Sequence, residues 1–102
     1  MRKVREGKMV QGQDEKIAYS ITTTPWGSSP ADAAVSIYRV TAGAYEDVSD
    51  DCLEAGSPQV DGDKITTPRV IGLTPGELYR LEIQFTAGGQ VFEPYIEIEA
   101  ER

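Results

Sequence analysis

Apolar and polar residues alternate with a period of two along most of this chain. The clearest run is LYRLEIQF at residues 78–85, where every second residue is apolar and faces away from arginine, glutamate and glutamine. KIAYSITTT at 16–24 and YIEIEAE at 95–101 repeat the pattern with β-branched and aromatic residues. Such alternation is typical of antiparallel strands with one face on the core and one in water.

Turn signals separate these runs at intervals of about 8–12 residues, which is the spacing found in sandwiches and barrels. Glycine, proline and serine gather in PWGSSPAD, AGSPQVDGD, LTPGE and TAGGQ. The pattern predicts strands near Lys8–Val10, Lys16–Thr24, Ala34–Thr41, Tyr45–Ser49, Lys64–Ile71, Leu78–Ala87 and Gln90–Ala100. A helical turn is expected in Ser49–Gly56. It should be short, because Gly56 and Pro58 end it quickly.

Two of the predicted strands contain proline. Proline cannot donate to a strand ladder, so Pro68 predicts an edge strand or a bulge, and Pro94 does the same for the last strand. Two edge strands in which proline limits further pairing favour a small open sandwich over a closed barrel.

The tyrosine of LYRLEIQF stands just after a turn, in the segment Leu73-Thr74-Pro75-Gly76-Glu77-Leu78-Tyr79. In immunoglobulin-type sandwiches a tyrosine at this place buries its ring and bonds its hydroxyl to the backbone just upstream. The segment resembles the fibronectin type III corner, except that Glu77 stands where that family usually has threonine. Ile21 also departs from the tryptophan often found in its second strand. We therefore predict an all-β, Ig/fibronectin type III-like sandwich of about seven antiparallel strands in two sheets.

The length of 102 residues fits one domain, which we assign to residues 1–102, with 1–7 as a mobile N-terminal arm. The net charge of −7 argues against a nucleic-acid partner. No apolar run long enough for a secretory signal or a membrane span is present, so we expect synthesis in the cytoplasm and no membrane partner.

The sequence offers little for catalysis. It has no histidine, which removes the commonest general base, and its one cysteine, Cys52, reads as a small apolar residue. Asp47, Asp50 and Asp51 are the candidate ligands for a weak calcium site, although their spacing matches no EF-hand, and a solvated acidic loop is the simpler interpretation. We predict no enzymatic activity and no cofactor, because no nucleophile–base pair can be identified.

Aromatic residues are the remaining candidates for recognition. Trp26 is interpreted as a lid at one end of the core, or else as part of an aromatic surface for sugar or protein together with Tyr38, Tyr45 and Tyr95. Tyr95 faces opposite to Ile96, so it is expected on the wet face, among Glu93, Glu97 and Glu99. That setting suits the rim of a protein interface.

A longer resemblance covers about residues 48–99. There the chain is similar to small Ig-like proteins encoded among phage and prophage tail genes, in residues Gly56, Ser57, Gly62, Gly76, Tyr79, Leu81, Gly88, Gly89, Ile96 and Ile98. The resemblance implies a structural or adaptor role in a tail or fibre, contacts with other tail subunits, weak self-association within the assembly and a place in the virion. The alternative is a carbohydrate- or surface-binding module of a bacterial adhesin or extracellular protein.

Overall fold

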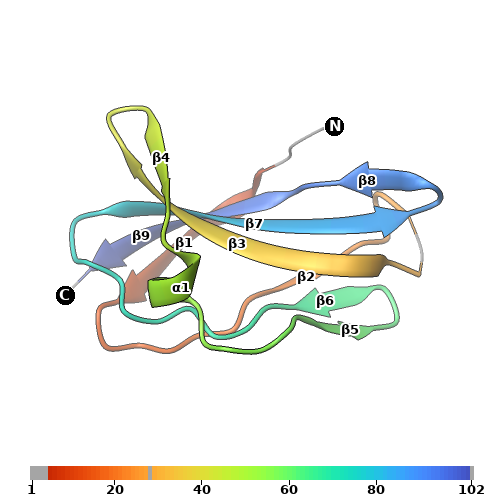
Figure 1. Cartoon of the computed structure of the whole chain (residues 1–102), viewed down its shortest axis with the longest axis horizontal. Helices are drawn as coiled ribbons and strands as arrows, with labels where there is room; N and C mark the ends of the chain where they lie inside the picture. Colours follow the sequence, from red (N-terminus) through yellow and green to blue (C-terminus); the bar gives the residue numbers. More distant parts are fainter. Residues whose placement is uncertain (1–4, 28, 102) are drawn as a thin grey trace.

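The chain folds into two facing β-sheets (Figure 1). This computed structural model describes residues 5–27 and 29–101, with side chains described from Met9 onward. Within these residues there are nine strands and one short helix: β1 (Arg5–Gly12), β2 (Ser20–Thr22), β3 (Ala31–Thr41), β4 (Ala44–Asp47), α1 (Ser49–Cys52), β5 (Gln59–Asp61), β6 (Lys64–Thr66), β7 (Leu78–Ala87), β8 (Gln90–Phe92) and β9 (Tyr95–Glu101). The predicted all-β sandwich is therefore confirmed, with β5 as a strand that the sequence pattern did not reveal.

The large sheet has the order β1-β9-β7-β3-β4, with β8 paired to the end of β7, and the small sheet has the order β2-β6-β5. One pairing differs from the prediction of antiparallel strands, because β1 runs parallel to β9. Hairpins force neighbouring strands to be antiparallel, whereas β1 and β9 lie at opposite ends of the chain and no short turn joins them. Their relative direction is set by the sandwich as a whole.

The core lies between the inner faces of the two sheets. On β7 every second side chain from Tyr79 to Ala87 is buried, as the alternation predicted. Ile37 of β3 and Ile98 of β9 extend this apolar face, and Ile65 of β6 belongs to the same buried cluster. The inner face of the large sheet therefore supplies most of the buried apolar surface that stabilises the fold.

The corner before β7 is closed by its tyrosine. The Tyr79 side chain is 1% exposed, and its hydroxyl accepts a hydrogen bond from the backbone N–H of Thr74 at 2.9 Å. Leu73 is buried beneath the turn, and Gly76 has a φ of 87°, a conformation that favours glycine. The expected contact between Tyr79 and the preceding turn is present.

The small sheet is shorter than the alternating pattern suggested. Its predicted strands covered Lys16–Thr24 and Lys64–Ile71, but β2 and β6 have three residues each. Beyond β6 the ladder changes character, because Pro68 has no N–H to donate and the Tyr19 N–H is accepted by the Thr67 hydroxyl at 3.1 Å. The Thr67 N–H still donates to the Tyr19 carbonyl at 2.7 Å, and an isolated bridge pairs Ile17 with Val70.

The prolines do not mark sheet edges. The β6 strand lies between β2 and β5, and β9 lies between β1 and β7, so of the two predicted alternatives, an edge strand or a bulge, the edge strand is wrong for both. Pro68 falls after the end of β6, and Pro94 falls between β8 and β9, which divides the predicted strand Gln90–Ala100. Each proline interrupts the pairing of an interior strand. Because proline has no N–H to donate, it lies outside the hydrogen-bonded ladder.

The beginning of the chain is more ordered than expected. Strand β1 starts at Arg5, so residues 5–7 of the predicted arm 1–7 belong to the large sheet, and the rest of the arm lies outside the described residues. The pairing with β9 shifts register between Arg5 and Lys8. In the described part of the chain, no helix has the length and apolar character needed to cross a membrane.

Candidate functional site

The outer face of the large sheet carries a row of apolar and aromatic residues that one glutamate interrupts. Strand pairing places Val10, Glu99, Leu78, Val40 and Tyr45 side by side across five strands, β1, β9, β7, β3 and β4. Val10 is 54% exposed and Tyr45 is 59% exposed, and Leu78 and Val40 are half-buried between them. Exposed apolar and aromatic side chains on an outer face, here Val10 and Tyr45, are a feature that a partner can cover.

The next row of this face is built around one arginine. The Arg80 guanidinium carbon lies 3.6 Å from the centre of the Tyr95 ring and 5.5 Å from the centre of the Tyr45 ring. Arg80 Nη1 also donates to the Tyr45 hydroxyl at 3.3 Å. Cation–π contacts of this kind hold an arginine and its aromatic neighbours in a fixed arrangement. We call Tyr45, Arg80 and Tyr95 the aromatic–arginine cluster.

The charge of Arg80 is balanced within the strand. Its Nε lies 2.9 Å from Glu82 Oε2, which is an ion-pair distance, yet the Nε–H is not directed at a hydrogen-bond acceptor. The pair is held by charge and by the two rings more than by a directed bond. Both side chains are largely covered, at 15% and 13% exposure, so this pair is screened less than an exposed one.

A shallow hollow lies beside the cluster on the same face. It has a volume of about 210 Å³ and is lined by Ala34, Ser36, Tyr38, Glu82, Gln84 and Glu93. The small side chains of β3 leave this space, and the polar groups surround it. Gln84 Nε2 donates to Glu93 Oε2 at 3.0 Å, so the two polar side chains at one wall are fixed relative to each other.

The predicted calcium ligands have other roles in the structure. Asp47 Oδ1 accepts the backbone N–H of Ser49 at 2.9 Å, and this hydrogen bond lowers the pKa of the Asp47 carboxyl. Asp50 and Asp51 are exposed in the first turn of α1. Among the described residues, no group of three histidine, cysteine or acidic residues is arranged to hold a metal ion, so Asp47, Asp50 and Asp51 are not brought together as a cation site.

The other residues singled out from the sequence fall in two environments. Cys52 is buried, and burial raises the pKa of its thiol, as expected for a small core residue. Trp26 is half-buried and packs edge-on against Phe85 with ring centres 6.0 Å apart, which agrees with the core-lid interpretation. Tyr95 lies on the outer face, but it is half-buried beneath Arg80 and less exposed than expected.

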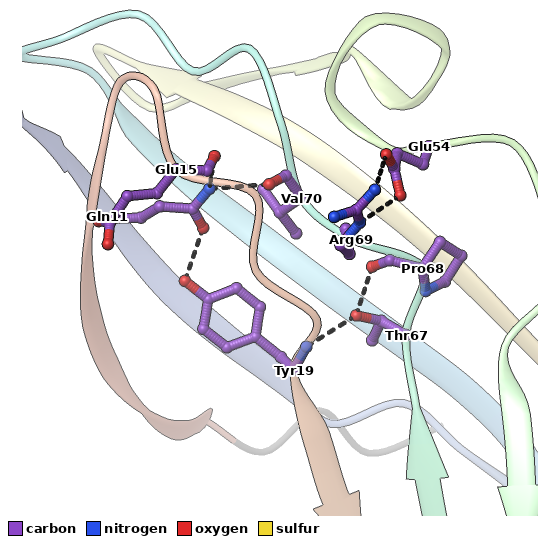
Figure 2. A network of polar contacts seen from close by, with 8 residues as sticks. All are labelled: Gln11, Glu15, Tyr19, Glu54, Thr67, Pro68, Arg69 and Val70. Atoms are coloured by element: carbon purple, nitrogen blue, oxygen red, sulfur yellow. Dashed lines mark hydrogen bonds and ion pairs between the residues drawn. The ribbon is translucent and has the colours of Figure 1, made fainter.

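Sequence reasoning missed the polar network that ties β1 to the rest of the sandwich (Figure 2). Gln11 is fully buried, and its amide nitrogen donates to the Val70 carbonyl at 2.8 Å and the Glu15 carbonyl at 3.0 Å. The Tyr19 hydroxyl donates to Gln11 Oε1 at 2.7 Å. Burial, followed by the charge of Glu15, raises the pKa of Tyr19 to about 12. Every polar atom of the Gln11 side chain has a hydrogen-bond partner, so this network stabilises the fold and is not a reactive site.

Arg80 was missed for a different reason. The alternating pattern placed it on the wet face, but only the register of β4, β7 and β9 brings Tyr45, Arg80 and Tyr95 together. The one signal in the sequence was an aromatic and an arginine at outward positions of neighbouring strands. No protein-family model matches this chain, and no curated protein matches it.

Proposed function

We propose that this chain is a non-enzymatic structural or adaptor module, of Ig/fibronectin type III-like type, that acts through protein–protein contacts in a phage or prophage tail. The observation that carries the proposal is the aromatic–arginine cluster of Tyr45, Arg80 and Tyr95 on the outer face of the large sheet. Tyrosine and arginine are enriched among the residues that dominate binding at protein interfaces. The corner contact of Tyr79 with Thr74 supports the assignment of fold type.

The geometry of the outer face suits a flat contact. The row that ends at Tyr45 lies next to the cluster, with Glu99 of β9 inside the row and with Glu97 of β9 and Glu82 of β7 beside the cluster. Protein interfaces commonly combine such apolar and aromatic residues with polar groups. In an assembly with many copies, each contact can be weak, because repeated attachment multiplies the strength of binding.

Tail particles purified from an induced host culture test the proposal. We expect mass spectrometry to find the chain at a fixed ratio to the other tail proteins. Tyr45→Ala should lower incorporation, whereas Val60→Ala is a matched control, because Val60 is an exposed apolar residue on the small sheet. Intact particles without the chain would contradict the tail role. Equal losses for the two variants would contradict the choice of face.

A carbohydrate-binding module is the second candidate, and the hollow of about 210 Å³ favours it. The Tyr38 ring at one end and the hydroxyl, amide and carboxylate groups around it are the kinds of groups that hold a sugar ring. Titration of isotope-labelled protein with glucose, galactose and N-acetylglucosamine, followed by NMR, tests this function. Saturable shifts at Ser36 and Gln84 that vanish in Ser36→Leu would favour sugar binding over the adaptor role.

A further inference from the structure

The part of β3 nearest to α1 has an open edge. Ile37 marks the side of β3 that faces away from β7: its N–H donates to Ser49 Oγ at 3.0 Å, and its carbonyl accepts the Val48 N–H at 3.0 Å. Backbone groups of a strand point to alternate sides, so those of Val35, two residues earlier, point the same way. Strand β4 pairs with residues 38–41 of β3 and does not reach Val35.

The pairing on the other side of β3 supports this assignment. Val35 lies opposite Ile83 of β7, and the Ile83 N–H donates to the Pro94 carbonyl at 3.0 Å, away from β3. Val35 and Ile83 are therefore a pair that exchanges no backbone hydrogen bonds. The N–H and carbonyl of Val35 are directed out of the large sheet, at the edge that α1 leaves uncovered.

A hollow lies at this same edge. It has a volume of about 290 Å³, and its lining includes Val35, Leu53, Pro58 and Pro68 as apolar residues and Asp50 and Glu54 as acidic ones. The Val35 side chain lies on the inner face of β3, on the same side as the buried Ile37. A residue placed opposite Val35 on an added strand would point to this inner face, and its side chain would enter the hollow.

The charges at the hollow favour a basic occupant. Asp50 is exposed at its rim, and the whole chain carries a net charge of −7. Glu54 is already paired with Arg69, whose Nε lies 2.6 Å from Glu54 Oε1. Asp50 is therefore the carboxylate that a cation of the partner meets first. The register of β3 is irregular between Ala31 and Ala34, which limits regular pairing to a short stretch and makes binding weak.

We infer that the edge of β3 at Val35, with the adjacent hollow, is a strand-addition site for an extended segment of a partner protein in which apolar residues alternate with lysine or arginine. Backbone pairing supplies the affinity of such a site, and the pocket beside the edge supplies its specificity. The inference rests on the proposed role in protein–protein contacts and names a second contact, separate from the aromatic–arginine cluster.

The first test uses the isotope-labelled full chain and an acetylated, amidated hexapeptide of alternating lysine and valine. We expect saturable NMR shifts at Val35, Ser49 and Leu53 and slower hydrogen exchange of the Val35 N–H in the complex. The same peptide with N-methyl groups on its valines, whose N–H groups would face the edge of β3 at Val35, cannot pair there with valine side chains in the hollow and should not bind. Unchanged exchange at Val35 under saturation, or equal binding of the N-methylated peptide, would overturn the inference.

The second test is a matched pair of charge reversals, Asp50→Lys and Asp61→Lys. Both raise the net charge equally, but Asp61 lies on β5 and does not line the hollow. Asp50→Lys should weaken the lysine–valine peptide about fivefold, the size of one exposed ion pair, and should strengthen a glutamate–valine peptide. Asp61→Lys should change neither by more than about twofold. Equal effects of the two variants would show general charge attraction and reject the site.

Sedimentation of the chain alone separates a partner segment from a second copy. If copies occupy each other's edges, Val35 exchange is slow without peptide and depends on protein concentration, and the partner-segment inference fails. The tail experiment gives an independent result. Tails that lack the chain would reject the proposed assembly even if the peptide binds, whereas a peptide that does not bind would reject only the strand-addition site.

Discussion

Two tyrosines lie on opposite faces of the large sheet and show how differently the faces are used. Tyr79 is 1% exposed on the inner face, and its hydroxyl accepts the Thr74 N–H. Tyr45 is 59% exposed on the outer face, and its hydroxyl accepts a hydrogen bond from Arg80. The first contact joins residues that must be together in any folded molecule. The second holds an aromatic ring in water, where it contributes little to folding, and this is the setting in which we propose that a partner binds.

Removing the inner tyrosine should have the largest effect on stability. Tyr79→Ala should lower the free energy of unfolding by about 3–5 kcal/mol, because it removes a large buried ring and leaves a cavity. Urea denaturation followed by tryptophan fluorescence measures this, since Trp26 packs against Phe85 of the same inner face. A loss below 1 kcal/mol, the size expected of a surface change, would show that the ring does not contribute to the core.

Alkaline pH tests a second buried tyrosine. Burial raises the pKa of Tyr19 to about 12, above the value of about 10 for an unfolded tyrosine. Its contribution is therefore complete below about pH 10 and is lost as pH rises toward 12, a decrease of about 2–3 kcal/mol in the free energy of unfolding. Tyr19→Phe should lack this part of the decrease. Identical slopes for the two proteins between those pH values would contradict the shift.

The network around Gln11 places a polar side chain inside the fold. Gln11→Leu should lower the free energy of unfolding by about 1–3 kcal/mol, since it leaves the Val70 carbonyl and the Tyr19 hydroxyl without their partner. In Tyr19→Phe one of these groups is already gone, so a double-mutant cycle should show coupling between the two positions. Additive losses would mean that water replaces the amide.

A smaller effect is expected when the inner tyrosine keeps its ring and loses its hydroxyl. Tyr79→Phe should lower the free energy of unfolding by about 0.5–1.5 kcal/mol, the usual contribution of one hydrogen bond. The Thr74 N–H should also exchange faster with solvent. A denaturation midpoint equal to that of the wild type would show that the hydrogen bond between Tyr79 and Thr74 does not contribute to stability.

The sequence predicted the inner face better than the outer face, for a physical reason. Burial forces apolar residues into every second position of β7. The alternation between Tyr79 and Phe85 was therefore enough to predict which side chains of this strand face the core. Strand ends were less predictable, because beyond β6 the Tyr19 N–H donates to the Thr67 hydroxyl instead of a backbone carbonyl, and Pro68 has no N–H to donate. The β5 strand has three residues, all on the surface, and its single apolar residue, Val60, makes no alternating pattern.

The candidate sites depend on relations between strands that no local pattern contains. The aromatic–arginine cluster needs the register of β4 and β9 against β7 and β3, and the open edge at Val35 needs the early end of β4. The parallel pairing of β1 with β9 joins the two ends of the chain in the same way. Alternation shows which residues face water, but pairing decides which of them meet.

The smallest effect on stability is expected at the outer tyrosine. Tyr45→Ala should change the free energy of unfolding by no more than about 0.5 kcal/mol, because the side chain is 59% exposed and leaves no cavity. Its contacts with Arg80 are the ones that should change, so the Arg80 side-chain resonances should shift and broaden while the core resonances stay in place. Incorporation into tail particles should fall in the same variant, although the free domain remains folded. Tyr79→Phe is the matching control. It should be less stable than the wild type, but it keeps the outer face and should assemble normally. If Tyr45→Ala instead destabilises the chain as much as Tyr79→Phe does, then both faces support the fold, and the cluster of Tyr45, Arg80 and Tyr95 no longer indicates a binding surface.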